Sequence, residues 1–105
     1  NQSINLVISA NITSQKYRNW CKKNLKNFVQ IYIRASLESL KSRDYKGLYK
    51  KALSGKIKNV VGVDLPFSDP KKIDLFLSNN GSKKEFLKKV SVIKKFLKKN
   101  IIKIY

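Results

Sequence analysis

The chain has 105 residues, of which 42% are hydrophobic. This length and composition suffice for one domain or part of one, and they exclude a second domain. Lysine and arginine number 24 against 6 acidic residues, a formal net charge of +18. We therefore expect an anionic partner, which is a nucleotide, a phosphate, a nucleic acid or a membrane surface. The absence of histidine excludes Ser-His and Cys-His nucleophiles and zinc sites that contain histidine.

The single cysteine, Cys21, cannot form an internal disulfide, which predicts a reducing, cytoplasmic compartment. No apolar stretch approaches the roughly 18 residues of a membrane span, and the first residues do not resemble a signal peptide. We therefore expect no membrane partner. Because the chain starts at Asn1 and contains no methionine, we also expect that a segment upstream of it is missing.

The first third of the chain predicts a strand, a helix and a second strand. Residues 4–10 (INLVISA) form a short run rich in β-branched residues, typical of a strand buried on both faces. A helix is expected from Ser14, with Thr13 or Ser14 as its cap. Its predicted buried positions are Tyr17, Trp20, Cys21 and Leu25. Residues 28–33 (FVQIYI) predict a second, parallel strand joined to the first by a right-handed crossover, so the fold class is α/β.

The rest of the chain predicts three helices, one long loop and one or two strands. Short helices are expected at 37–43 and 48–53, the second ended by Gly55. Residues 56–70 lack helical periodicity and predict a loop that serves as a lid. Strands are expected at 74–77 and 101–105. Between them, Ser82 and Glu85 form a capping box that begins a helix to about Lys99. The predicted apolar stripe of that helix is Phe86, Val90, Ile93 and Leu97.

Lysine pairs flank this apolar stripe and offer a basic face for phosphate backbones. A solvated helix face explains them better, because no aromatic or arginine cluster accompanies them to recognise bases. We therefore expect no specific nucleic-acid partner.

The most informative segment is 43–64, RDYKGLYKKALSGKIKNVVGVD. It resembles the adenylylsulfate (APS) kinase family, whose signature here runs RD-x-KGLYKKA-x-xG-x-IK-x-FTG-x-D. The stretches LVISANIT, VQIYIRASLESLKSRD and VDLPFSDPKKIDLFL resemble neighbouring parts of the same family. The resemblance covers essentially all of residues 1–105, as the C-terminal part of a single APS-kinase-like domain with its lid at about 56–70. It implies a P-loop kinase-like, three-layer α/β/α fold with a parallel sheet.

The resemblance implies transfer of the ATP γ-phosphoryl group to the 3′-hydroxyl of APS, which gives PAPS, the activated sulfate donor. Phosphoryl transfer needs mainly positioning and positive charge, which suits a chain without histidine. The implied cofactors are ATP and Mg²⁺, bound mainly by an N-terminal segment that this chain lacks. The family also implies a homodimer.

The family's functional residues match six positions of this sequence. Lys46 corresponds to the lysine that contacts the phosphosulfate region of APS, and Arg43 to the arginine near ATP. The remaining implied substrate-binding residues are Ile12, Thr13, Asn59 and Val60, while Gly47, Leu48 and Tyr49 shape the helix beside Lys46. Thr13 matches a serine that is sometimes assigned as a phosphorylated intermediate, although direct transfer is the mechanism we favour.

Each of these positions also has a structural explanation. Lys46 is one of many solvated charges, Arg43 has Asp44 and Glu38 as possible ion-pair partners, and Thr13 is a candidate helix cap.

The sequence departs from the family in two ways. No G-x-x-x-x-G-K-[ST] phosphate loop occurs, so we expect the isolated chain to be inactive. In the lid, Asn59-Val60-Val61-Gly62 replaces Phe-Thr-Gly, which removes the ring that stacks on adenine. Relatives with similar lids phosphorylate a cytidine nucleotide that carries a phosphoramidate, in capsule biosynthesis, which gives a second candidate substrate. Two hypotheses from different classes are a non-catalytic basic nucleic-acid-binding module and a degenerate scaffold descended from a kinase.

Overall fold

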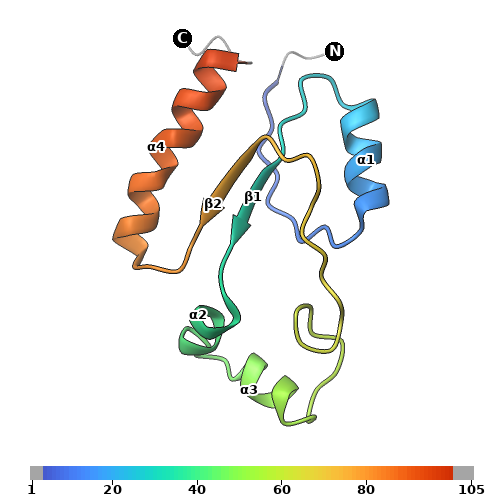
Figure 1. Ribbon diagram of the computed structural model, residues 1–105, viewed down its shortest axis with the longest axis vertical. Helices are drawn as coiled ribbons and strands as arrows, with labels where there is room; N and C mark the ends of the chain where they lie inside the picture. Colours follow the sequence, from blue (N-terminus) through green and yellow to red (C-terminus); the bar gives the residue numbers. More distant parts are fainter. Residues whose placement is uncertain (1–3, 101–105) are drawn as a thin grey trace.

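The computed structural model describes residues 4–100, which form an α/β arrangement of four helices and two strands. Figure 1 shows them in chain order. The elements are α1 (Gln15–Asn24), β1 (Ile31–Arg34), α2 (Leu37–Ser42), α3 (Leu48–Leu53), β2 (Leu75–Ser78) and α4 (Lys83–Asn100). The predicted α/β class is confirmed, and the predicted helices at 37–43 and 48–53 are confirmed to within one residue.

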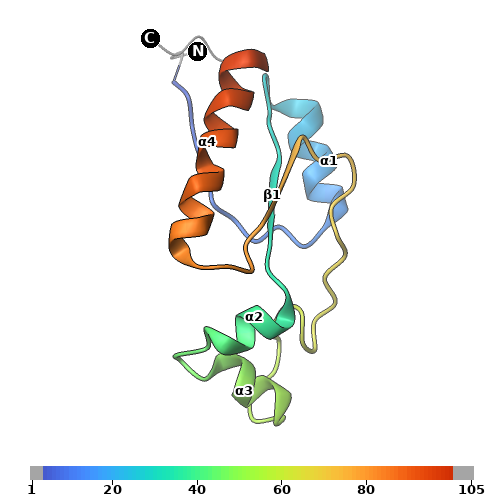
Figure 2. The same ribbon diagram turned by 60° about the vertical axis from the view of Figure 1, so that its left-hand side comes forward.

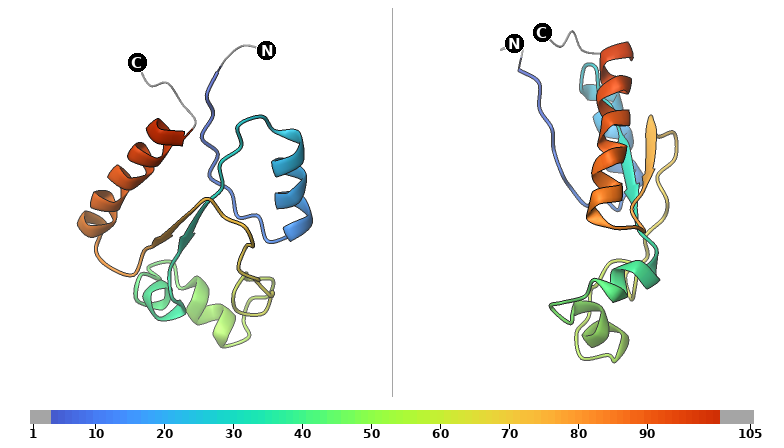
Figure 3. Two further views of the ribbon diagram at one scale, coloured as in Figure 1. Left: turned by 45° about the horizontal axis from the view of Figure 1, so that its top comes forward. Right: turned by 90° about the vertical axis from the view of Figure 1, so that its left-hand side faces the viewer.

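The two strands are parallel and neighbouring, in a register that runs from Ile31 opposite Leu75 to Arg34 opposite Ser78. Their connection contains α2, α3 and the long loop, as parallel pairing requires. Helices α1 and α4 lie on opposite sides of the strand pair (Figures 1 and 3). Both strands end toward the α2–α3 hairpin (Figure 1). This common end of the two strands is where the candidate site lies.

The predicted strand at 4–10 is wrong, because this segment has no regular secondary structure. It runs in the same direction as β1 but does not pair with it (Figure 2). Its apolar side chains are exposed, with Val7 at 96%. A strand needs neighbours for its backbone N–H and C=O groups, and the described residues supply none to this segment. The predicted crossover between 4–10 and the next strand is therefore absent, and the parallel pair is β1 with β2.

Helix α1 is confirmed, but its predicted buried face is wrong. Trp20 is 58% exposed and Tyr17 is also exposed, whereas Arg18 is only 4% exposed. Cys21 is half-buried. The N-cap is Ser14, whose side chain makes no capping hydrogen bond. Arg18 takes the buried position because its guanidinium binds backbone and amide oxygens there, which satisfies its charge.

The capping box of α4 is confirmed. The Ser82 N–H donates to Glu85 Oε2 at 2.7 Å, and the Glu85 N–H donates to Ser82 Oγ at 3.2 Å. Most of the predicted apolar stripe is half-buried, although Val90 is exposed. Lys89 joins this face and donates from Nζ to the backbone oxygen of Ser78 at 2.7 Å. The predicted strand at 101–105 lies outside the described residues.

The buried core is small for a chain of this length. Among the described hydrophobic residues only Ala52, Val60 and Leu77 are fully buried. The accessible surface is 9049 Å², whereas a compact protein of this mass exposes roughly 6,000 Å². Between residues 4 and 100, no helix has the length and apolar character to cross a membrane.

Candidate functional site at the carboxyl ends of the strands

A cavity of about 180 Å³ lies where β1 and β2 end. Its lining residues are Arg34, Ser36, Phe76, Ser78 and Asn80. Arg34 and Ser78 are the last residues of the two strands. In open parallel sheets, ligands bind in the crevice outside the carboxyl ends of the strands. The position of this cavity makes it the candidate ligand site.

Hydrogen bonds fix the polar walls of the cavity. The Ser36 N–H donates to Asn80 Oδ1 at 2.7 Å, which ties the start of α2 to the segment after β2. Lys89 Nζ donates to Ser78 Oγ at 2.8 Å from α4. The walls therefore come from both strand ends and are held by contacts between residues far apart in the sequence.

Arg43 lies at the C-terminal end of α2 and fastens this helix to the segment after β2. Its Nη1 donates to the backbone oxygen of Asn79 at 2.8 Å, and its Nη2 donates to that of Gly81 at 2.7 Å. These two acceptors flank Asn80, so Arg43 adjoins the cavity. Among residues 4–100, Arg43 makes no ion pair with Glu38 or Asp44, so that alternative is wrong. Asp44 instead accepts a hydrogen bond from the Lys50 N–H at 2.9 Å.

The long loop at 56–70 is confirmed as a segment without helix or regular strand, and a tight turn is built around Asp64. The Asp64 carboxylate accepts hydrogen bonds from the N–H groups of Asn59 and Val60, each at 2.7 Å. These backbone hydrogen bonds hold the pKa of Asp64 below its ordinary value. Gly62 has φ +85°, a conformation that favours glycine. The structure thus brings Asn59 and Val60 together on one carboxylate, with the Val60 side chain buried.

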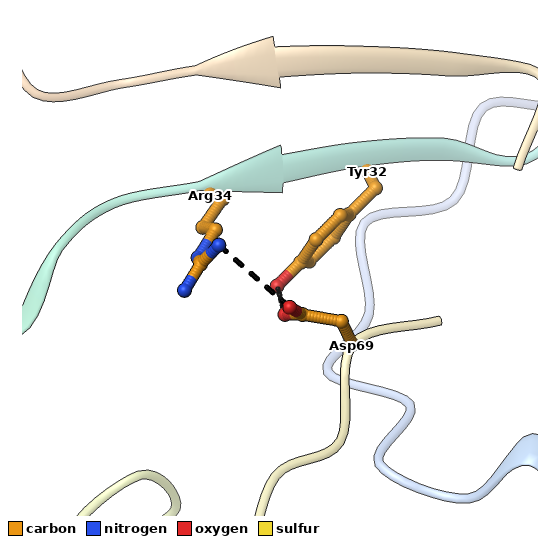
Figure 4. A network of polar contacts seen from close by, with 3 residues as sticks. All are labelled: Tyr32, Arg34 and Asp69. Carbon is orange, nitrogen blue, oxygen red and sulfur yellow. Dashed lines mark hydrogen bonds and ion pairs between the residues drawn. The ribbon is translucent and has the colours of Figure 1, made fainter. Parts of the chain in front are cut away.

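The exit of this loop is fastened to β1 by three side chains (Figure 4). The Tyr32 hydroxyl donates to Asp69 Oδ1 at 2.6 Å, and Arg34 Nη1 lies 3.7 Å from Asp69 Oδ2. The ring of Tyr32 also packs near Phe67 and Phe76, with centroid distances of 6.1 Å and 5.7 Å. Burial, followed by the hydrogen bond to Asp69, raises the pKa of Tyr32 to about 12. Asp69 therefore connects the loop to a residue that lines the cavity.

Ile12 and Thr13 precede α1, in exposed positions. Arg18 donates to the backbone oxygen of Ile12. Gln15 Oε1 accepts from Arg18 Nε and from the Lys71 N–H, both at 3.1 Å. The turn into α1 lies toward the carboxyl ends of the strands (Figure 1). Arg18 and Gln15 thus fix the backbone of Ile12 relative to the segment that follows the loop.

Lys46 lies between α2 and α3, with its Nζ 5.7 Å from the ring centroid of Tyr45. Gly47 caps α3 at φ +68°, which sets the direction of the chain after Lys46. Within residues 4–100, no hydrogen bond or ion pair joins Lys46 or Thr13 to the cavity. Arg43 therefore adjoins the cavity, whereas Asn59 and Val60 lie together in the loop. Within residues 4–100, no hydrogen bond or ion pair joins Arg43 to these two residues.

Sequence reasoning missed four residues of this region, which are Arg34, Asp64, Asp69 and Tyr32. The position of Asp64 after a glycine turn is a local signal that predicts capping of the turn. Arg34 and Asp69 are 35 positions apart, so no local pattern predicts their ion pair.

The described residues do not fit a magnesium site of their own. No group of three or more potential Asp, Glu, His or Cys ligands occurs between residues 4 and 100. Carboxylate clusters and phosphate oxygens are the ligands that Mg²⁺ prefers. We therefore assign no residue of this chain to the metal.

Comparison with known proteins places the chain in a family. Residues 1–78 match the family model described as adenylylsulphate kinase. A cytidine diphosphoramidate kinase of Campylobacter jejuni is 46% identical over 76 residues, which cover 72% of this chain and 44% of that protein. Adenylyl-sulfate kinases of Clostridium kluyveri and Clostridium acetobutylicum are each 46% identical, over 55 and 59 residues. These alignments cover 52% and 55% of this chain, and 28% and 30% of the two relatives.

No solved structure matches the chain. The chain spans less than half the length of these relatives. The family model, however, covers most of the 105 residues, through the end of β2. The chain therefore belongs to the adenylylsulphate kinase family.

Proposed function

We propose that this chain is the C-terminal part of a kinase that phosphorylates the 3′-hydroxyl of APS with ATP. A bond forms between the 3′-oxygen and the γ-phosphorus, and the bond from that phosphorus to the β-phosphate oxygen breaks. ADP leaves, and the proton of the hydroxyl passes to solvent. Membership of the family supports phosphoryl transfer to a nucleotide. The identity of that nucleotide as APS is the more specific part of the proposal.

The position of the RD-x-KGLYKKA segment carries this proposal. The segment, residues 43–52, forms the connection that follows α2 and most of α3, on the side of the molecule toward which the strands end (Figure 1). Arg43 fastens it to the loop after β2. We assign Arg43 to the ATP side of the site and Lys46 to the acceptor anion, because fixed cations stabilise the negative oxygens of a transferring phosphoryl group.

The remaining assigned residues position the acceptor. Ile12 and Thr13 offer backbone groups before α1, and Asn59 and Val60 offer the backbone of the loop. Direct transfer needs no covalent intermediate on Thr13. The P-loop kinase-like three-layer fold, the single domain with its lid, the homodimer and the cytoplasmic location belong to the same proposal, on family resemblance. Mg²⁺ would neutralise phosphate charge when bound, but no step is assigned to it through these residues.

A cytidine nucleotide carrying a phosphoramidate is the second candidate acceptor. The Campylobacter jejuni relative aligns with a larger share of this chain than the two Clostridium relatives do. In the loop, Asn59 and Val60 supply no aromatic ring, and the Val60 side chain is buried. A lost base-aromatic stack weakens binding by about 1 to 3 kcal/mol, which is enough to change the preferred base.

The test uses the protein made from the complete reading frame, with labelled ATP and either APS or cytidine 5′-diphosphoramidate as acceptor. Transfer to APS supports the first proposal, and transfer only to the cytidine compound supports the second. Transfer to neither contradicts both and favours the scaffold. Salt-sensitive binding of DNA or RNA in place of transfer would favour the basic module.

A further inference from the structure

We propose that the outer face of α4 binds the surface of an anionic lipid membrane, with lysines on the headgroup phosphates and apolar side chains at the level of the headgroups. This face lies outside the candidate site, and the inference does not depend on the proposed function. The match to the family model ends at residue 78, before α4 begins, so that match does not account for the lysines of α4.

Helix α4 concentrates positive charge on one side. It contains eight lysines and one acidic residue, Glu85. Lys89 turns to β2 and donates to Ser78. The other seven lysines are exposed and form no hydrogen bond or ion pair from their side chains within residues 4–100. At the helical period they fall on one side of α4. These seven residues, the lysine face, are Lys83, Lys84, Lys88, Lys94, Lys95, Lys98 and Lys99.

No acidic side chain among residues 4–100 pairs with the lysine face. The Glu85 carboxylate is engaged in the capping box, where it accepts from the Ser82 N–H at 2.7 Å. Lysines four positions apart, such as Lys84 and Lys88 or Lys95 and Lys99, repel each other along the helix. A solvated surface usually mixes charges of both signs. An anionic surface would relieve the repulsion that this face carries by itself.

Apolar side chains lie among these lysines. Leu87 is 57% exposed and Val92 is 45% exposed. Leu87 lines a surface hollow together with Lys83, Lys84 and Lys88, so ammonium groups surround an apolar side chain. A membrane surface accommodates both kinds of group, because its phosphates bind the ammonium groups and its interface accepts the leucine and the lysine stems. Clusters of about four to eight basic residues on an amphipathic helix are typical of anionic-lipid binding.

The position of α4 leaves this face accessible. Figures 1 and 3 show α4 at the edge of the described chain, on the side of the strand pair opposite α1. Its 18 residues extend over about 27 Å. A helix of this length that lies flat on a membrane brings every residue of the lysine face within the roughly 8 Å over which charges act in physiological salt.

A nucleic acid is the competing anionic partner, and it fits this face less well. A phosphate backbone would bind the lysines but would offer no partner to Leu87 and Val92. The lysine face also contains no arginine or aromatic side chain that could stack on bases. The expectation of no membrane partner concerned segments that span the bilayer or direct export, whereas binding to the membrane surface needs neither.

The experiment measures co-sedimentation of the protein from the complete reading frame with vesicles. The vesicles contain phosphatidylcholine alone or with about one third phosphatidylserine. Wild type should bind only the anionic vesicles, and more weakly as salt rises. Each lysine near an anionic surface contributes about a fivefold factor. The triple variant Lys88→Gln, Lys95→Gln and Lys99→Gln should therefore weaken binding about a hundredfold.

The matched control carries Lys16→Gln, Lys23→Gln and Lys26→Gln, which are exposed lysines in α1 or just after it. It removes the same charge from the opposite side of the strand pair and should weaken binding less than about fivefold. A further variant, Leu87→Ala, keeps the charge and should weaken binding to anionic vesicles about threefold or more, because it removes apolar carbon from the headgroup region.

Circular dichroism establishes that each variant is folded, and the single variant Lys88→Gln, with an expected loss of about fivefold, decides the question if the triple variant is not. Absence of wild-type binding to anionic vesicles would overturn the inference, as would equal losses in the triple variant and its control. Binding of duplex DNA without binding of anionic vesicles would assign the face to nucleic acid and overturn it too. Vesicle binding is measured without a nucleotide, so its failure leaves the proposed function untouched.

Discussion

At the scale of single residues, two aspartates organise the loop at 56–70 in different ways. Asp64 binds the N–H groups of Asn59 and Val60 and shapes the turn. Asp69 binds Tyr32 and faces Arg34, which fastens the exit of the loop to β1. Both contacts use a carboxylate as acceptor, so both depend on its charge. The loop is therefore held in its conformation by two carboxylates.

The substitution Asp64→Asn should loosen the turn, because a neutral amide oxygen accepts more weakly than a carboxylate. We expect faster hydrogen–deuterium exchange at the amides of Asn59 and Val60. The control is Glu38→Gln, which neutralises an exposed carboxylate of α2. Unchanged exchange at both amides in Asp64→Asn would contradict the role of the Asp64 carboxylate in holding the turn.

The same contact predicts a pH dependence. The folded pKa of Asp64 lies below its unfolded value. The ionised carboxylate therefore stabilises the folded turn fully above the unfolded pKa of about 3.9. This stabilisation is lost as pH falls through the lower, folded pKa. Protection of the Asn59 and Val60 amides should therefore persist at about pH 5 to 7 and be lost only in stronger acid. Hydrogen–deuterium exchange at several pH values, corrected for the intrinsic exchange rate at each, measures this loss.

Tyr32 gives a second test, at the alkaline end. Its pKa is raised to about 12, so the neutral phenol is favoured in the folded chain. The resulting stability is constant below the unfolded pKa of about 10 and is lost as pH rises toward the folded value. In a spectroscopic titration, a late ionisation step near pH 12 should appear, and Tyr32→Phe should remove that step. A late step that survives in Tyr32→Phe would assign it to a different tyrosine.

At the scale of elements, short sequence motifs correctly predicted the helix ends, because interactions between neighbouring residues determine them. The start of α4 follows from a capping box within four residues, and the end of α3 from Gly55, which adopts φ +78°. The strand at 4–10 and the buried face of α1 depend on distant chain segments. Residues such as Tyr17 and Trp20 are apolar at helical spacing, but nothing in the described chain covers them. Periodicity predicts a helix, whereas its buried face requires a partner.

The capping box of α4 makes Gly81 sensitive to substitution. A Cβ atom at this position would collide with Glu85 Oε2, the atom that accepts from the Ser82 N–H. Gly81→Ala should therefore displace the Glu85 side chain and cost about 1 kcal/mol, the typical contribution of a helix cap. The measurement is the free energy of unfolding by denaturant.

A double-mutant cycle separates this cause from a general effect of alanine. If the collision acts through the cap, Gly81→Ala should cost little once Glu85→Ala has already removed the acceptor. Additive costs would instead place the effect in the backbone of the segment before α4. The same cycle with Lys84→Ala, an exposed neighbour in the first turn, should be additive.

At the scale of the whole molecule, the described chain does not enclose its apolar residues. The strand pair is covered by α4, which contacts β2, while residues 4–10 and the outer face of α1 remain exposed. The radius of gyration of 16.3 Å exceeds the roughly 13 Å of a compact domain of this length. A sheet of two strands with one helix against it is near the lower limit of independent stability. The sequence also lacks the glycine-rich loop that cradles ATP phosphates in kinases of this class.

These properties predict that the 105 residues alone do not transfer phosphate. Arg34, Arg43 and Lys46 carry positive charge, but no glycine-rich cradle for the β- and γ-phosphates and no cluster of metal ligands occurs between residues 4 and 100. Positioning of the donor accounts for most of phosphoryl-transfer catalysis, so we expect no ATP-dependent product from APS or from cytidine 5′-diphosphoramidate. The adenylyl-sulfate kinase of Clostridium kluyveri serves as the positive control for the assay. Measurable turnover by the isolated chain would mean that residues 1–105 position ATP by a different route, in which Arg43 and the cavity beside it would be the first groups to test.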